Sequence, residues 1–127
     1  MTVHQMRLQP QPFEKIRSGQ KTVELRLLDE KRKRVAVGDV IEFLCVEGSR
    51  EKLRARVVAL HRFDSFAALF RCRPLVEKCG YAPEELPFAS AGDMERYYAK
   101  EEEARWGVVA IELQLLERSV CSDGKQR

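Results

Sequence analysis

Hydrophobic and polar residues alternate most regularly in one short stretch, residues 22–27. The apolar positions are Val23, Leu25 and Leu27, and the polar positions are Thr22, Glu24 and Arg26. This period of two predicts a half-buried β-strand. Residues on the same face of a strand are two rises of roughly 3.3 Å apart, so a hydroxyl, a carboxylate and a guanidinium would follow one another about every 7 Å on the polar face.

A short helix is predicted before this strand. Glycine adopts the left-handed conformation at a helix end without steric cost, so Gly19 predicts the end of that helix. Its body would run from about Pro12 to Ser18, with proline in the first turn and with Phe13 and Ile16 buried. Lys21 would then stand at the entrance of the strand.

Periodicity, turn residues and capping residues predict the other elements. The turn signal Glu47-Gly48-Ser49 joins two of the strands and predicts an antiparallel hairpin. Ser65 is the expected N-cap of the next helix. The predicted strands are Met6–Leu8, Val40–Val46, Leu53–Ala59 and Val108–Leu116, and the further predicted helical stretches are Phe66–Phe70 and Ser90–Ala104.

This order of elements predicts an α+β fold. We expect a small, mostly antiparallel β-barrel of about five strands, with helices packed at its ends. A chain of 127 residues suits one hydrophobic core, so residues 1–116 would form a single domain. Residues 117–127 form a polar tail without periodicity, which we expect to be disordered.

Composition places the chain among globular proteins, with 44% hydrophobic and 34% charged residues. No apolar run approaches the roughly 20 residues that span a bilayer, and the first residues lack the plan of a signal peptide. We therefore expect a cytoplasmic protein without a membrane partner. The four cysteines contain no C-x₂-C pair, so the sequence supports neither a zinc site nor a disulfide framework, and we expect no metal or organic cofactor.

Charge is segregated along the chain. Seven basic and three acidic residues lie between Arg17 and Arg34, whereas seven acidic and two basic residues lie between Glu84 and Glu103. A basic patch raises the local concentration of phosphate groups, which favours a nucleic-acid or nucleotide partner. The acidic segment is either a solvated helical stretch that faces elsewhere or a counterweight beside the basic patch.

Several common enzyme signatures are absent from the sequence. It contains no G-x-S-x-G elbow, Walker loop, dinucleotide fingerprint, H-E-x-x-H pair or EF-hand loop, which excludes those classes in their usual form. The histidines, His4 and His61, are each either a general base or a structural residue, and His61 would follow a strand directly.

The best candidates for chemistry are Lys21, Glu24 and Arg26. A lysine at a helix–strand junction could act as a base or contact a phosphate. Glu24 could pair with it or take a proton, and Arg26 could grip a phosphate or a nucleobase edge with two hydrogen bonds. The alternative is an exposed strand face with cross-strand ion pairs.

Further ligand contacts are expected from the basic run Lys31–Arg34, which is either a solvated loop or a set of contacts to a nucleic-acid backbone. Tyr97 and Tyr98 are about 100° apart on a helix, so one of them could stack on a base while the other packs in the core. The expected ligand-binding residues are Lys21, Thr22, Glu24, Arg26, Arg32, Lys33, Arg34, Tyr98 and Lys100.

Three motifs together resemble the ASCH (activating signal cointegrator homology) domain. They are Gly19-x-Lys21-Thr22-Val23-Glu24-Leu25-Arg26, then Val37-Gly38-Asp39-x-Ile41-x-Phe43, and finally Gly107-Val108-Val109-Ala110-Ile111. The resemblance implies a PUA-like β-barrel and the handling of RNA or nucleotides. It also implies a cleft between barrel and helices, lined by the strand that carries the Gly-x-Lys-Thr motif.

One branch of that family removes the acyl group from N4-acetylcytidine with a lysine, a nucleophilic threonine and a glutamate. The lysine corresponds to Lys21, but Glu24 stands at the position of the threonine, so this chain departs from the pattern where the nucleophile is expected. Thr22 belongs to the shared Lys-Thr motif. The candidates for the family glutamate are Glu95, Glu101, Glu102 and Glu103.

The sequence therefore leaves three hypotheses, and it does not decide whether the protein is an enzyme. The first is a non-catalytic, or at most weakly catalytic, RNA- or nucleotide-binding module with a basic cleft at the barrel mouth. The second is a small hydrolase acting on a modified nucleoside or on RNA, with Lys21 and Glu24 as an acid–base pair. The third is an adaptor that uses the acidic stretch around residues 95–103.

Overall fold

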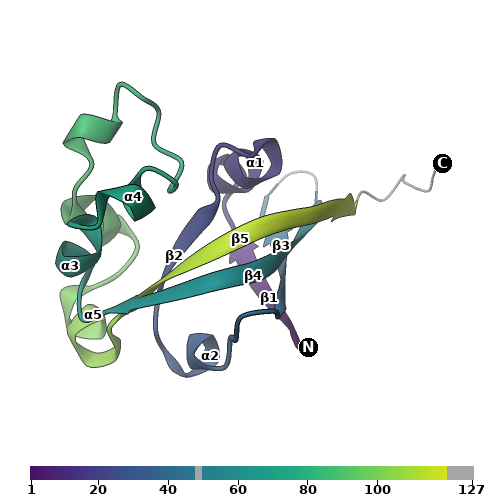
Figure 1. The fold of residues 1–127 in the computed structure, drawn as a ribbon, viewed down its shortest axis with the longest axis horizontal. Coiled ribbons are helices and arrows are strands. Elements are labelled where there is room, and N and C mark those ends of the chain that lie inside the picture. Colours follow the sequence, from purple (N-terminus) through teal and green to yellow (C-terminus); the bar gives the residue numbers. More distant parts are fainter. Residues whose placement is uncertain (48–49, 120–127) are drawn as a thin grey trace.

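The structure, a computed structural model, describes residues 1–47 and 50–119. In Figure 1, α3, α4 and α5 gather on one side of the molecule next to β2, and α1 and α2 lie at the two ends of β2. The elements are β1 (Val3–Leu8), α1 (Pro10–Ser18), β2 (Val23–Leu27), α2 (Glu30–Lys33), β3 (Val40–Cys45), β4 (Lys52–Phe63), α3 (Phe66–Phe70), α4 (Arg73–Val76), the 3₁₀ helices η1 (Leu86–Phe88) and η2 (Ala91–Arg96), α5 (Lys100–Trp106) and β5 (Val108–Ser119).

The strands form one curved sheet in the order β1-β3-β4-β5-β2. Neighbouring strands are antiparallel except for β1 and β3, which are parallel. The mostly antiparallel, barrel-like fold is therefore confirmed, in the form of a mixed half-barrel. Strands β1 and β2 are its two edges, and the sheet hydrogen bonds do not join them.

The two faces of the sheet pack into separate hydrophobic clusters. One cluster contains Phe13 and Ile16 of α1, as predicted, together with Val109 and Ile111 of β5. The other cluster joins the opposite face to α3 and α4 and contains all three apolar residues of β2: Val23, Leu25 and Leu27. The polar side chains of β2 therefore point to its other side, towards the barrel.

Two caps and one strand pairing confirm three local predictions, although residues 48–49 of the predicted turn lie outside the described residues. Gly19 ends α1 with a φ of 89°, in the left-handed region. Ser65 caps α3 by accepting a hydrogen bond from the backbone N–H of Ala68. Strands β3 and β4 pair as the expected antiparallel hairpin.

Several boundaries differ from the predictions. Helix α1 begins at Pro10 instead of Pro12. Strand β4 continues to Phe63, so His61 lies within a strand and does not follow one. Residues 31–33 of the expected basic loop belong to α2, because the side chain of Asp29 caps that helical turn. The predicted helical stretch 90–104, expected as one or two helices, is two, η2 and α5, and α5 continues to Trp106.

Strand β5 is longer than the predicted strand Val108–Leu116. Strand β5 extends to Ser119, whose partner in β4 is Lys52, so the first three residues of the expected tail pair in the sheet. Residues 120–127 lie outside the described residues. Among the residues that the structure describes, no helix is both long and apolar enough to cross a bilayer.

Candidate functional site

A cleft of about 840 Å³ lies between the barrel and the chain segment 79–98. Its floor is the polar side of β2 with Lys21 in front of the strand. One wall comes from the end of β1 and from α1, and the facing wall comes from residues 79–98. An isolated bridge between Lys21 and Cys79 holds the second wall against the floor.

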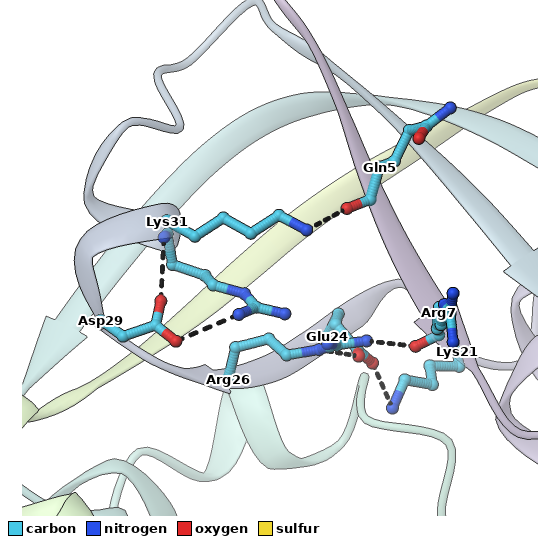
Figure 2. A network of polar contacts seen from close by, with 8 residues as sticks. Gln5, Arg7, Lys21, Glu24, Arg26, Asp29 and Lys31 are labelled. Atoms are coloured by element: carbon cyan, nitrogen blue, oxygen red, sulfur yellow. Dashed lines mark hydrogen bonds and ion pairs between the residues drawn. The ribbon is translucent and has the colours of Figure 1, made fainter.

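The floor carries an ion triad centred on Glu24 (Figure 2). Oε1 of Glu24 lies 2.9 Å from Nζ of Lys21, and Oε2 lies 2.7 Å from Nε of Arg26. All three side chains are largely buried: Lys21 is 13% exposed, Glu24 is 5% exposed and Arg26 is 12% exposed. The polar face of β2 is thus largely covered and is not the half-exposed strand face that alternation alone predicted.

The triad fixes the charge state of Glu24. Burial raises the pKa of a carboxyl group, but the charges and hydrogen bonds of Lys21 and Arg26 outweigh it, so the pKa of Glu24 lies below its usual value. Glu24 is therefore an ionised carboxylate at neutral pH. It accepts hydrogen bonds readily but is a weak proton acceptor.

Arg26 has a second role, at the open side of the half-barrel. Its Nη2 donates a hydrogen bond of 2.8 Å to the carbonyl oxygen of Arg7 on β1. Two residues away on the same strand, the carbonyl of Gln5 accepts a 2.6 Å hydrogen bond from Nζ of Lys31. Figure 2 shows both side chains reaching across to β1. Arg26 thus bridges the two edge strands that the sheet does not join, and Lys31 ties α2 to β1.

The facing wall combines a tight backbone turn with aromatic side chains. Gly80 has a φ of 99°, and a Cβ there would lie 3.1 Å from Cβ of Lys21. The hydroxyl of Tyr81 donates a 2.7 Å hydrogen bond to Asp93, which fixes the turn to η2. Tyr98 stacks on Phe66 at a centroid distance of 5.7 Å.

Exposed aromatic rings stand along the same wall. Tyr97 is 57% exposed and Phe88 is 82% exposed, although both line the cleft. Tyr98 is partly buried beside Tyr97, in agreement with the expectation of one core tyrosine and one outer tyrosine. The wall therefore offers flat apolar surfaces to a ligand.

Charge divides the cleft into two sides. The barrel wall contributes Arg7 and Lys15, and the floor contributes two cations and one anion. The facing wall contributes the carboxylates Glu84, Glu85 and Asp93 and the cation Arg96. Part of the acidic segment thus lies across the cleft from Lys21 and Arg26, as the counterweight interpretation expected.

The cleft collects only some of the residues expected to bind a ligand. Lys21, Glu24, Arg26 and Tyr98 line it. Thr22 does not line it. Its backbone N–H donates a hydrogen bond to the carbonyl of Lys78, and its carbonyl accepts one from the N–H of Leu113.

The remaining expected residues lie elsewhere. Arg32 pairs with Asp29 at 3.1 Å, and Lys100 lies 3.7 Å from Glu95. Lys33 lies over the ring of Trp106, and Arg34 is exposed at the end of α2.

None of the four candidates for the family glutamate lines the cleft, and all four belong to the described chain. Glu103 accepts a 2.7 Å hydrogen bond from the backbone N–H of Phe66, which makes it a cap of α3. Glu101 and Glu102 are exposed, and Glu95 faces a second, smaller pocket. The glutamates of the cleft are Glu24, Glu84 and Glu85.

Most residues of the two walls were not predicted from the sequence. Arg7, Lys15, Gly80, Tyr81 and Asp93 line the cleft without belonging to a motif. Arg7 alternates with the buried residues of β1, which is a weak signal that it faces outward. The other four come together only through the packing of residues 79–98 against α1 and β2.

Neither histidine lies in the cleft. His4 on β1 pairs with Asp39 at 2.8 Å, and His61 on β4 pairs with Glu112 at 2.5 Å. Lys78 lies 3.4 Å from the other oxygen of Glu112. Both histidines thus have carboxylate partners away from the cleft, which matches the structural alternative.

The cleft holds no activated thiol or metal cluster within the part of the chain that the structure describes. Burial raises the pKa of Cys79 to about 11, and its thiol donates to the carbonyl of Leu75, so it remains protonated at neutral pH. No group of three His, Cys, Asp or Glu residues within the described ranges could hold a metal ion.

Comparison with known families identifies the class of this fold. The family model of the ASCH domain matches residues 6–117, and the chain therefore belongs to the ASCH domain family. The motifs around Lys21 and Gly38, and the motif from Gly107 to Ile111, all fall within the matched range.

Solved structures support this assignment. The hypothetical protein PH0355 is 31% identical, with a TM-score of 0.72 over 91% of this chain and 100% of its own. Protein PF0455 from Pyrococcus furiosus is 35% identical, with a TM-score of 0.64 over 91% of this chain and 99% of its own. The ASCH protein from Zymomonas mobilis shares the fold. It is 16% identical, with a TM-score of 0.60 over 94% of this chain and 74% of its own. A comparison with curated proteins gives no significant match.

Proposed function

We propose that this ASCH domain binds a nucleotide, free or as part of an RNA chain, in the cleft above Glu24. The observation that carries the proposal is the buried triad of Lys21, Glu24 and Arg26 on the floor of an open cleft. A buried ion triad adds little to stability compared with well-packed apolar side chains, so its value lies in presenting fixed hydrogen-bonding groups to a ligand.

The two sides of the cleft suit the two ends of a nucleotide. Arg7 and Lys15, with Lys21 below them, provide cations for a phosphate group. On the other side, Tyr97 and Tyr98 provide flat surfaces for a base. The carboxylate of Asp93 accepts hydrogen bonds, which suits an exocyclic amino group on the edge of a base.

The size of the cleft agrees with this proposal. Ligand pockets for small molecules range from roughly 300 to 1,000 Å³, and this cleft measures about 840 Å³. Its cations and anions nearly balance, which favours a ligand with both a phosphate and hydrogen-bond donors over a bare polyanion.

Hydrolysis by Lys21 and Glu24 as an acid–base pair has weaker support. Two cations hold Glu24 ionised with a lowered pKa, which makes it a poor base. Thr22 stands outside the cleft, and the thiol of Cys79 is protonated. The arrangement offers firm binding groups but no activated nucleophile among the residues described here.

Isothermal titration calorimetry with the four ribonucleoside 5′-monophosphates tests the proposal. We expect saturable binding that weakens with salt, and a loss of at least about tenfold in Lys21→Met, because the cation that faces the phosphate disappears. Arg71→Ala is the matched control, since this exposed arginine lies at the end of α3 outside the cleft. Equal affinities for Lys21→Met and the unmodified protein would show that the ligand does not use the triad.

A further inference from the structure

Two cations lie against one indole ring at the junction of α2 and α5. Nζ of Lys33 lies 5.3 Å from the centroid of the Trp106 ring, and Cζ of Arg105 lies 4.8 Å from it. The ring itself packs against the cluster that contains Phe66 and Leu27. A fixed aromatic ring therefore orders two long, flexible basic side chains that would otherwise be free.

These two cations are available to a ligand. Both side chains are exposed, and within residues 1–47 and 50–119 neither has a carboxylate partner or a hydrogen bond from its side chain. Both cations lie near the same ring, so an anion beside that ring is attracted by two positive charges. On the cleft floor, by contrast, Lys21 and Arg26 share one carboxylate, Glu24.

The fold fixes the position of this pair relative to the cleft. The floor of the cleft runs along β2 from Lys21 to Arg26, and α2 begins shortly beyond the end of that strand. The backbone N–H of Leu28 donates to the carbonyl of Gly107, which holds the end of β2 against the end of α5. In Figure 1, α2 and α5 flank the same end of β2.

We propose that Lys33 and Arg105, ordered by Trp106, bind the phosphate backbone of a single-stranded RNA whose neighbouring nucleotide occupies the cleft. This inference rests on the proposed nucleotide binding and extends it from a single nucleotide to a strand. Among the described residues, none from α2 or α5 lines the cleft, so a mononucleotide held by the cleft residues alone contacts neither Lys33 nor Arg105. A strand that leaves the cleft along β2 meets both cations.

Contacts of this kind add affinity without reading sequence. Removing one phosphate contact to a single strand should reduce the slope of log affinity against log salt by about 0.7. The aromatic ring is already covered by two cations, so Trp106 acts as a support for them and Tyr97 and Tyr98 remain the surfaces for bases.

The test compares two probes on the full chain: a ribonucleoside 5′-monophosphate and a fluorescein-labelled uridine oligonucleotide of about ten residues, long enough for a typical single-strand site. Lys33→Ala and Arg105→Ala should each weaken oligonucleotide binding by about two- to fivefold, the range of an exposed ion pair, and should flatten its salt dependence. Neither variant should change mononucleotide affinity. Arg105→Lys keeps the charge and should restore most of the oligonucleotide affinity, and Arg71→Ala is the control for removal of an exposed arginine.

Different failures separate the two proposals. If mononucleotides and the oligonucleotide both bind, but Lys33→Ala and Arg105→Ala leave oligonucleotide affinity and salt slope unchanged, the backbone contact is wrong and the cleft proposal stands. If neither probe binds, nucleotide binding fails and the extension fails with it. If an acidic peptide of glutamates binds in place of the oligonucleotide and the two variants weaken it, the surface recognises protein instead of RNA, and the inference is overturned.

Discussion

The guanidinium of Arg26 donates a 2.8 Å hydrogen bond to the backbone carbonyl of Arg7, and this contact joins β2 to β1, the two edges of the half-barrel. The same guanidinium holds Glu24 at 2.7 Å. The polar floor of the cleft and the closure of the half-barrel therefore share one side chain. A change at Arg26 affects both the site and the stability of the fold.

Substitution of this arginine should be costly. In Arg26→Met, buried Glu24 loses one of its two cations, and the carbonyl of Arg7 loses its donor. Removing one partner of a buried ion pair lowers stability by about 3 kcal/mol or more, because the other charge stays buried. We expect a loss of this size in the free energy of unfolding, measured by urea denaturation followed by circular dichroism.

The control for this prediction is Arg17→Met. Arg17 pairs with Glu14 on the surface of α1, where an ion pair contributes at most about 1 kcal/mol. The double variant Glu24→Gln/Arg26→Met should recover part of the loss, since the buried charge is then removed as well. Equal losses at Arg26 and Arg17 would contradict the bridging role.

Gly80 should tolerate no side chain. Its φ of 99° is unfavourable for other residues, and a Cβ would lie 3.1 Å from Cβ of Lys21 and 3.2 Å from Cδ of Lys15. We expect Gly80→Ala to destabilise the protein by about 1 to 2 kcal/mol and to weaken nucleotide binding, because the added methyl group displaces two cations of the cleft.

Gly92→Ala is the matched control. The nearest atom to a Cβ at this position is Oγ of Ser90 at 3.5 Å, an ordinary contact, and the φ is not in the left-handed region. Its thermal midpoint and nucleotide affinity should stay close to those of the unmodified protein. Similar effects at Gly80 and Gly92 would mean that the turn at Gly80 does not shape the cleft.

Asp39 should make stability depend on pH below 4. A hydrogen bond from His4 and bonds from the backbone N–H groups of Ala36 and Thr2 lower its pKa from 3.8 to about 2. Because this pKa is lowered in the folded state, ionised Asp39 stabilises the fold. That stabilisation is fully present above about pH 4 and is lost as the pH falls towards 2.

This dependence is measured by urea denaturation at several pH values. Asp39→Asn should be less stable than the unmodified protein at pH 7, and the difference between them should shrink as the pH falls from about 4 to 2. Asp64→Asn, a change at an exposed position, is the control. A difference for Asp39→Asn that stays constant over this range would contradict the assigned role.

Glu24→Gln separates binding from catalysis. Removal of the negative charge leaves Lys21 and Arg26 free to attract a phosphate, so we expect mononucleotide affinity to rise by about two- to fivefold, with a steeper salt dependence. The hypothesis of an acid–base pair instead requires loss of turnover on a modified nucleoside. Calorimetry for affinity and chromatography for products distinguish these outcomes.

Local signals in the sequence predicted the local structure well. The helix end at Gly19, the cap at Ser65 and the β3–β4 hairpin depend on neighbouring residues, and all three are confirmed. The parallel pairing of β1 with β3 was not predicted, since it joins segments more than 30 residues apart, such as Val3 and Val40. The alternation of apolar and polar residues along a strand predicts which residues share a face, but it does not predict which segment packs on that face.

The same limit explains which parts of the candidate site the sequence could suggest. Glu24 and Arg26 were singled out because they share the polar face of one strand, and Lys21 because it stands just before that strand. Their burial depends on residues 79–98, which carry no motif that ties them to β2. Charge segregation drew attention to both segments, but the presence of Lys21 and Asp93 in one cleft follows only from the tertiary fold.

The most direct test of nucleotide binding is a titration of the ¹⁵N-labelled protein with a ribonucleoside 5′-monophosphate, followed by ¹H–¹⁵N correlation spectra. The proposal predicts saturable shifts of the amides of Lys21, Gly80 and Tyr98 around the cleft, and their loss in Lys21→Met. Shifts confined to the outer side of β4, for example at Arg56, or no shifts at all in a folded sample, would contradict it.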